Sequence, residues 1–76
     1  MKRDKAFEKL VCNELASICR KRYSLDEVIA LHQKAYDHYK WCVTSRYKPV
    51  NPIDVAYVNA LARYAATKGV PLREIR

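Results

Sequence analysis

The chain has 76 residues, of which half are hydrophobic, and its 15 Lys and Arg outnumber eight Asp and Glu, giving a formal net charge of +7. This length fits one domain, residues 1–76, and excludes a second. With 30% charged residues and one glycine, the composition is that of a folded chain and not of a disordered tail. The cationic excess favours anionic partners.

The cysteines and the first residues bear on the cellular compartment. Cys12, Cys19 and Cys42 are an odd number without a CxxC pair, and residues 1–10 contain no apolar stretch typical of a signal peptide. We therefore expect a reduced, cytoplasmic environment. No apolar run approaches the roughly 20 residues that a membrane-spanning helix needs, so we expect no membrane partner.

The first element is an amphipathic helix, predicted over residues 4–22. Its apolar side chains recur at the three- and four-residue steps that share one helical face: Phe7, Leu10, Val11, Leu15, Ile18 and Cys19.

A second helix is predicted over residues 25–47. Ser24 and Glu27 have the spacing of a capping box, and Tyr23 with Val28 has that of a hydrophobic staple. Pro49 ends the helix because its ring nitrogen has no hydrogen to donate. The predicted apolar stripe is long: Leu25, Val28, Ile29, His32, Ala35, Tyr36, Tyr39, Cys42, Val43 and Tyr47. A broad apolar face with only two shorter neighbours also favours a homodimer.

The third helix is predicted over residues 52–68. Asn51 is a suitable N-cap, Pro52 fits the first helical position, and Gly69 after Lys68 is a typical stop. Its expected buried face is Ile53, Tyr57, Ala60, Leu61 and Tyr64, with Val58 and Ala65 at the margin. Residues 72–76 are expected to add one turn or to fray. The sequence thus predicts an all-α, compact three-helix domain with a short C-terminal turn.

Positive charge is concentrated at the two ends of the first predicted helix. Phosphates of a nucleic acid, or an acidic partner surface, could be contacted along it by Lys2, Arg3, Lys5 and Lys9 and by Arg20, Lys21 and Arg22. A plainer interpretation competes with this one. Several acids stand at predicted helix starts and several cations at predicted ends, which is the arrangement that helix dipoles favour.

Trp41 is predicted to project away from the apolar stripe of the second helix. An exposed tryptophan among Lys34, Lys40 and Lys48 suits a protein-binding hot spot or a platform on which an unpaired base stacks. The alternative is that a terminal segment of the chain folds over it. Five of the six tyrosines fall on predicted inner faces and are expected to belong mostly to the core.

The histidines and cysteines give little reason to expect chemistry. His32 lies in the apolar stripe, where a packed and hydrogen-bonded histidine is expected. His38 and Cys42 are one turn apart, but the close ligand pairs typical of structural zinc are missing. We find no candidate catalytic residues, so neither an enzyme nor a bound metal or cofactor is expected.

Two functions remain open at this stage. The first is a small basic, non-enzymatic regulator that acts on nucleic acid or on a nucleoprotein complex. The alternative is an inhibitor or adaptor of the kind that phages and plasmids encode, which docks an acidic partner surface through Trp41 and the surrounding lysines.

Overall fold

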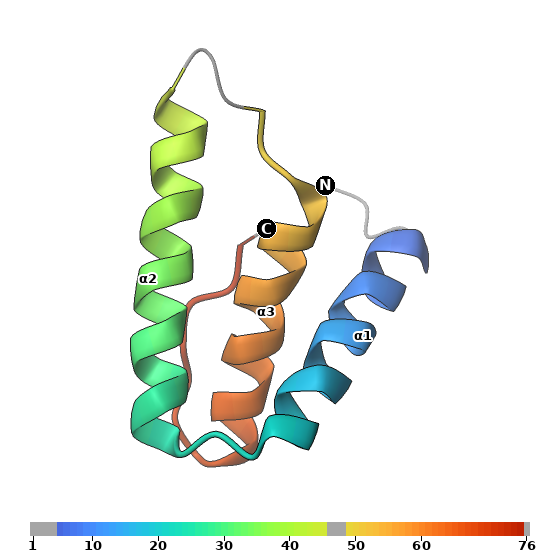
Figure 1. Ribbon diagram of the computed structural model, residues 1–76, viewed down its shortest axis with the longest axis vertical. Coiled ribbons are helices and arrows are strands. Elements are labelled where there is room, and N and C mark those ends of the chain that lie inside the picture. The colour runs from blue at the N-terminus through green and yellow to red at the C-terminus, as the bar shows by residue number, and fades with distance from the viewer. Residues whose placement is uncertain (1–4, 46–48, 76) are drawn as a thin grey trace.

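The computed structural model describes residues 5–45 and 49–75, and within these ranges the chain forms three helices (Figure 1). They are α1 (Lys5–Lys21), α2 (Leu25–Thr44) and α3 (Pro52–Thr67). The predicted all-α, three-helix fold is confirmed. None of the helices in the described part is long and apolar enough to cross a membrane.

The predicted helix boundaries rest on local capping bonds that the structure contains. The Ser24 hydroxyl accepts a hydrogen bond from the Glu27 backbone N–H at 3.2 Å. The same hydroxyl also donates a hydrogen bond to the Glu27 carboxylate. In the predicted capping box this carboxylate would instead accept from the Ser24 backbone N–H. Asn51 accepts from the Ile53 N–H at 2.9 Å, with Pro52 in the first turn. Both caps satisfy N–H groups that have no partner inside the helix.

The end of α3 forms a Schellman motif around Gly69. The Val70 N–H bonds the Ala65 carbonyl and the Gly69 N–H bonds the Ala66 carbonyl, both at 3.0 Å. Gly69 has a φ of 86°, a conformation that is strained for other residues. The glycine stop is therefore confirmed, and the chain reverses direction there.

The prediction that the second helix reaches residue 47 is wrong, because Ser45 is already extended, with φ −91° and ψ 128°. The Thr44 hydroxyl donates to the Lys40 and Trp41 carbonyls at 3.0 and 3.1 Å. The Trp41 carbonyl also accepts the Ser45 N–H at 3.0 Å, so this is the last turn of the helix. Back-bonding by a Thr hydroxyl slightly destabilises a helix, and neither Thr nor Ser is a strong helix former. Tyr47, predicted to extend the stripe, lies outside the described residues.

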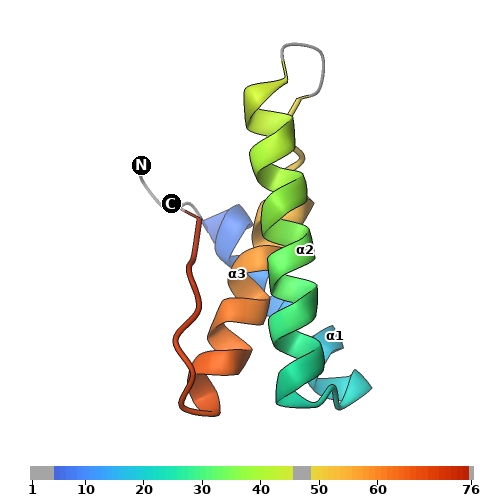
Figure 2. The ribbon, with the colours of Figure 1, turned by 90° about the vertical axis from the view of Figure 1, so that its left-hand side faces the viewer.

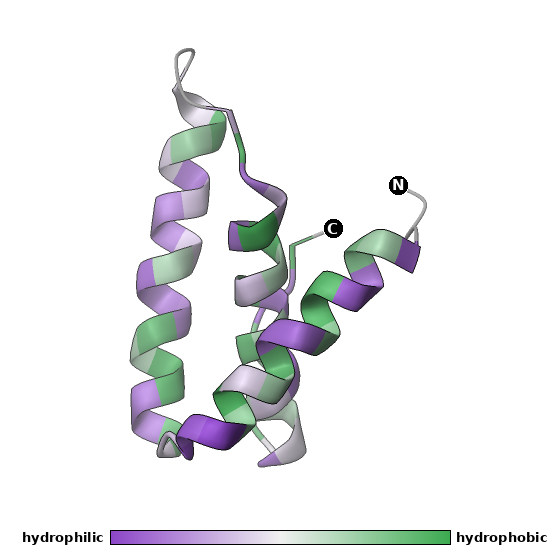
Figure 3. Ribbon diagram, turned by 45° about the vertical axis from the view of Figure 1, so that its right-hand side comes forward, coloured by the Kyte–Doolittle hydropathy of each residue, from purple (hydrophilic) through white to green (hydrophobic). Residues whose placement is uncertain are grey.

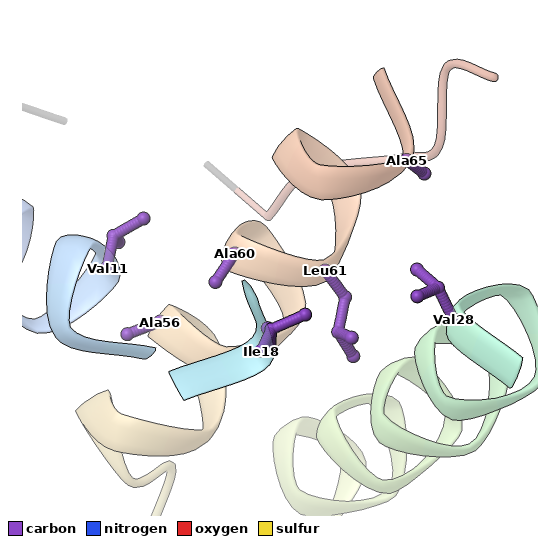
Figure 4. Close-up of a cluster of buried hydrophobic side chains, with 7 residues drawn as sticks. All are labelled: Val11, Ile18, Val28, Ala56, Ala60, Leu61 and Ala65. Atoms are coloured by element: carbon purple, nitrogen blue, oxygen red, sulfur yellow. The ribbon is translucent and has the colours of Figure 1, made fainter. Parts of the chain in front are cut away.

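α3 is the central helix, with α1 on one side and α2 on the other (Figures 1 and 2). Over the described residues, no Cα atoms of α1 and α2 approach within 8 Å of each other. The molecule is a flat slab of 35 × 26 × 19 Å, with α1 and α2 along opposite edges. The main core lies where both outer helices meet α3, and its fully buried members are shown in Figure 4: Val11, Ile18, Val28, Ala56, Ala60, Leu61 and Ala65.

The central position of α3 changes its expected burial. Val58 and Ala65, predicted to lie at the margin, are fully buried. Ile53, predicted to be buried, is 50% exposed. It lies in the first turn of α3, before Val55, which is the first buried residue of this helix. A helix covered on several sides has no single apolar stripe, so its periodicity is a poor guide to burial.

Three residues of the outer helices are also more exposed than predicted. Cys19 is exposed because, among the described residues, α1 has only α3 as a helical neighbour, and α3 covers the side that carries Val11 and Ile18. On α2, Ile29 is 39% exposed and Val43 55% exposed. The apolar stripe of α2 is therefore wider than the surface that packs against it.

Residues 70–75 neither form a helical turn nor fray, contrary to the expectation for this region. We call them the C-terminal strap, an extended segment that runs back along α3 (Figure 2). The Asn59 side chain bonds both the N–H and the carbonyl of Ile75, at 2.7 and 2.9 Å. The Arg73 carbonyl accepts a bond from His32 of α2 at 2.7 Å. The strap thus fills the groove between α2 and α3, and Ile75 is buried there.

Candidate nucleic-acid interface

The exposed charged residues of α1 and of the turn that follows are all basic. Helical spacing places most of them on the side turned away from α3. Figure 3 shows α1 in front, with hydrophilic segments along its length. We call this surface the α1 edge and define it by its exposed residues: Lys5, Ala6, Lys9, Cys12, Asn13, Ala16, Cys19, Arg20, Lys21 and Arg22.

The two acids of α1 lie toward the packed side of the helix. Glu8 forms an ion pair with Arg63 of α3 at 3.4 Å. Glu14 is partly buried, and its charge acts on Tyr57 of α3: burial, Tyr23 and Glu14 together raise the pKa of that phenol. Glu8 and Glu14 are thus both half-buried on the side of α1 that faces α3, and the exposed charged residues of α1 are all cations.

The C-terminal end of α1 adjoins the C-terminal end of α3. The Tyr64 hydroxyl donates to the Tyr23 carbonyl at 3.4 Å, joining the two ends. The Lys21 ammonium lies 5.9 Å from the centre of the Tyr23 ring, and the Lys68 ammonium lies 5.7 Å from that of Tyr64. Such contacts hold each cation near an aromatic face while its charge stays in solvent. Lys68 therefore adds to the positive end of the α1 edge.

The structure brings together most of the basic residues that the sequence analysis selected. Lys5 and Lys9 lie at one end of the α1 edge and residues 20–22 at the other, roughly 22 Å apart at 1.5 Å per residue. Lys2 and Arg3 lie outside the described residues. Lys68 was not predicted to be a binding residue, because nothing in the sequence around it indicates that the end of α3 lies beside the end of α1.

Trp41 is 52% exposed, which confirms its predicted orientation. The His38 ring lies 6.1 Å away at a tilt of 31°. Lys34 and Lys40 are exposed on the same helix, as is Asp37, one turn before Trp41. Lys48, the third predicted lysine, lies outside the described residues.

We call the surface around Trp41 the α2 edge, and its charges are mixed. It is defined by the exposed residues Asp26, Glu27, Ala30, Gln33, Lys34, Asp37, Lys40, Trp41 and Thr44. Three acids and two lysines share it, so it lacks the uniform positive charge of the α1 edge.

The two histidines of α2 make contacts that join this helix to other parts of the fold. His32 is 7% exposed and bonds the strap, as predicted for a packed histidine. His38 approaches Asp54 of α3 at 3.7 Å and the Cys42 thiol at 3.6 Å. Within the described ranges, no three His, Cys, Asp or Glu side chains are grouped so that they could hold a metal ion.

An open depression of about 260 Å³ lies beside the strap, lined by His32, Gln33, Tyr36, Asp37, Lys40 and Arg73. Its charged residues are of mixed sign, with Asp37 beside Lys40 and Arg73, and His32 already bonds the Arg73 carbonyl. The lining therefore selects no particular ligand class.

The fold and its surface define a small all-α protein with one uniformly basic edge. Comparisons of the chain with protein-family models, with curated proteins and with solved structures give no match.

Proposed function

We propose that this chain is a small, non-enzymatic binding protein that contacts the phosphates of a nucleic acid through the α1 edge and regulates that nucleic acid or its complexes. The observation that carries the proposal is the sign of the exposed charge on α1, where five cations, including Arg22 in the adjoining turn, are exposed and both acids are turned toward α3.

The physical basis is the release of counterions from the polyanion. Each phosphate that a Lys or Arg neutralises frees condensed cations, so binding is strongest at low salt and weakens steeply as salt is added. An arrangement with four or five phosphate contacts loses roughly 100- to 500-fold in affinity between about 50 and 200 mM salt. Helix-dipole complementarity alone accounts for cations at Arg20 and Lys21 but not for Lys5 and Lys9 near the helix start.

The test is a fluorescence-anisotropy titration of labelled DNA and RNA across a salt series. A steep linear fall of log affinity with log salt supports the proposal. Lys9→Gln/Arg20→Gln is expected to make the slope shallower by about 2, whereas Lys34→Gln/Lys40→Gln, a control with the same change of charge on the α2 edge, leaves it nearly unchanged. No binding to either polymer at low salt would refute the proposal.

A second candidate function is favoured by the exposure of Trp41. A half-exposed tryptophan on a regular helix, with Lys34 and Lys40 on the same surface, suits the centre of a protein-docking site for an acidic partner. This is the inhibitor or adaptor function, and it requires no contact through α1.

Trp41→Ala distinguishes a protein-docking role of Trp41 from a structural role. The variant is expected to lose partner binding while its melting temperature changes by only a few degrees, because about half of the side chain already faces solvent. The partner is first isolated from the native host with and without nuclease treatment. A large fall in melting temperature would show instead that Trp41 is a structural residue.

A further inference from the structure

The α1 helix is a projecting ridge. α1 lies along one edge of a slab whose smallest extent is 19 Å, and in the described part of the chain α3 is the only helix that packs against it (Figure 1). Its outer side is therefore free of neighbouring helices along the whole stretch from Lys5 to Lys21. A surface of this shape enters a groove more readily than it covers a flat partner.

The side chains of the α1 edge differ along its length. The cations Lys9 and Arg20 stand roughly 16 Å apart along the axis. Between them the exposed side chains are short: Cys12, Asn13, Ala16 and Cys19. Long positive side chains near the ends and short neutral ones in the middle allow the helix backbone to approach a polyanion closely.

This profile matches the major groove of B-form DNA. That groove is about 12 Å wide and admits an α-helix, while phosphates line both of its rims. Lys5, Lys9 and the cations of residues 20–22 would reach the rims, and the short middle would face the base edges. The major groove of A-form RNA is too deep and narrow for this approach. A single strand is held by stacking on aromatic side chains, and α1 exposes none.

We infer that the nucleic acid bound by this protein is double-stranded DNA, with the middle of the α1 edge seated in the major groove. The inference rests on the proposed function, because it names the polymer that the same cations contact. Most contacts are to phosphates, so binding is expected to depend only weakly on base sequence.

The cysteines provide a built-in probe of this geometry. Cys12 and Cys19 are exposed on the α1 edge, whereas Cys42 of α2 is buried. A helix seated in a groove hides the first two thiols, and Cys42 serves as an internal reference.

The first experiment measures alkylation of each thiol by N-ethylmaleimide, an uncharged reagent, with mass spectrometry as readout. The intact protein is treated alone, with duplex DNA, with duplex RNA of the same sequence, and with single-stranded DNA, all at low salt and equal saturation. We expect duplex DNA to slow alkylation of Cys12 and Cys19 at least fivefold, with a smaller effect from the other two polymers. Equal protection by all three, or none by duplex DNA, would overturn the inference.

The second experiment adds bulk without changing charge. Ala16→Trp places a large ring in the middle of the α1 edge, and Ala30→Trp places the same ring at an exposed position of α2 as a matched control. Both variants are compared by circular dichroism to verify the fold. We expect Ala16→Trp to lower affinity for duplex DNA at least tenfold and to leave single-strand affinity within about twofold, while Ala30→Trp changes neither.

The outcomes separate the two proposals. Salt-dependent binding that Ala16→Trp does not weaken would refute groove insertion and leave phosphate contact through α1 intact. Absence of binding to every polymer would refute the proposed function and the inference together.

Discussion

The two edges of the slab show how differently two consecutive helices can be exposed to solvent. The α1 edge exposes only polar, basic or short side chains, and its large apolar residues pack against α3. The α2 edge carries mixed charges, and α2 leaves Ile29, Trp41 and Val43 substantially exposed. Both helices use the same central partner. The difference shows that the width of an apolar stripe, relative to the surface available to cover it, decides what remains exposed.

The largest effect is expected from a matched pair of isoleucine substitutions. Ile18 of α1 is 1% exposed and Ile29 of α2 is 39% exposed. Ile18→Ala is expected to lower the free energy of unfolding by about 2–5 kcal/mol through lost burial and a residual cavity, and Ile29→Ala by less than about 1 kcal/mol. Urea unfolding measures both. Similar losses would mean that the two outer helices are equally well packed, and would remove the contrast.

Charge reversal on each edge tests the contrast in binding. Lys9→Glu/Arg20→Glu and Lys34→Glu/Lys40→Glu give the same net charge, so only the position of the change differs. We expect the α1 variant to lose about 100-fold in affinity for duplex DNA at low salt, and the α2 variant less than tenfold, because acids already offset its lysines. An anisotropy titration measures both affinities. Equal losses of affinity in the two variants would show that binding depends on net charge alone and not on the α1 edge.

Removing the anchor of the strap should affect α2 more than α1. Asn59→Ala leaves the buried N–H and carbonyl of Ile75 without their partners, which costs about 2 kcal/mol. Because the strap also bonds His32, hydrogen exchange should accelerate more in α2 than in α1. Uniform acceleration over both helices would show that the strap does not selectively secure α2.

A smaller, stabilising effect is expected at the end of α1. Arg22 has a φ of 52°, a left-handed conformation that glycine adopts with less strain. Arg22→Gly is expected to raise the free energy of unfolding by up to about 1 kcal/mol and to weaken DNA binding several-fold, since one cation is lost. Thermal unfolding and a salt titration separate the two effects. Reduced stability would mean that the arginine side chain itself supports the turn.

The smallest effect is confined to alkaline solution. Burial, with the charges of Tyr23 and Glu14, raises the pKa of Tyr57 above its usual value near 10. The unfolded chain then loses this proton at a lower pH than the folded chain, so stability is retained below about pH 10 and falls as the pH rises through the folded pKa. Tyr57→Phe should flatten this part of the stability profile. An unchanged slope would exclude a contribution from Tyr57.

Local sequence features predicted much of the fold because they act over a few residues. The caps at Ser24 and Asn51 and the stop at Gly69 depend on hydrogen bonds within one turn, and the structure contains them. The exposure of Trp41 and the burial of His32 follow from helical spacing. In the same way, the cations of α1 could be placed on one surface before the packing was known.

Features that depend on tertiary packing were not predictable in this way. Nothing local in residues 70–75 indicates that Asn59, 16 positions before Ile75, will bond its backbone. The burial of Val58 and Ala65 requires knowing that α3 is central. The pairing of Glu8 with Arg63, which turns an acid away from the α1 edge, is likewise a contact between distant parts of the chain.

The central place of α3 has a consequence for the order in which the protein can fold as it is synthesised. Over the described residues no Cα atom of α1 lies within 8 Å of one of α2, so the two helices bury their apolar sides mainly against α3. The helix that unites them, α3, follows both in the sequence. A ribosome that has completed α2 therefore presents two helices without a core, and cooperative folding must await the emergence of α3 and the strap.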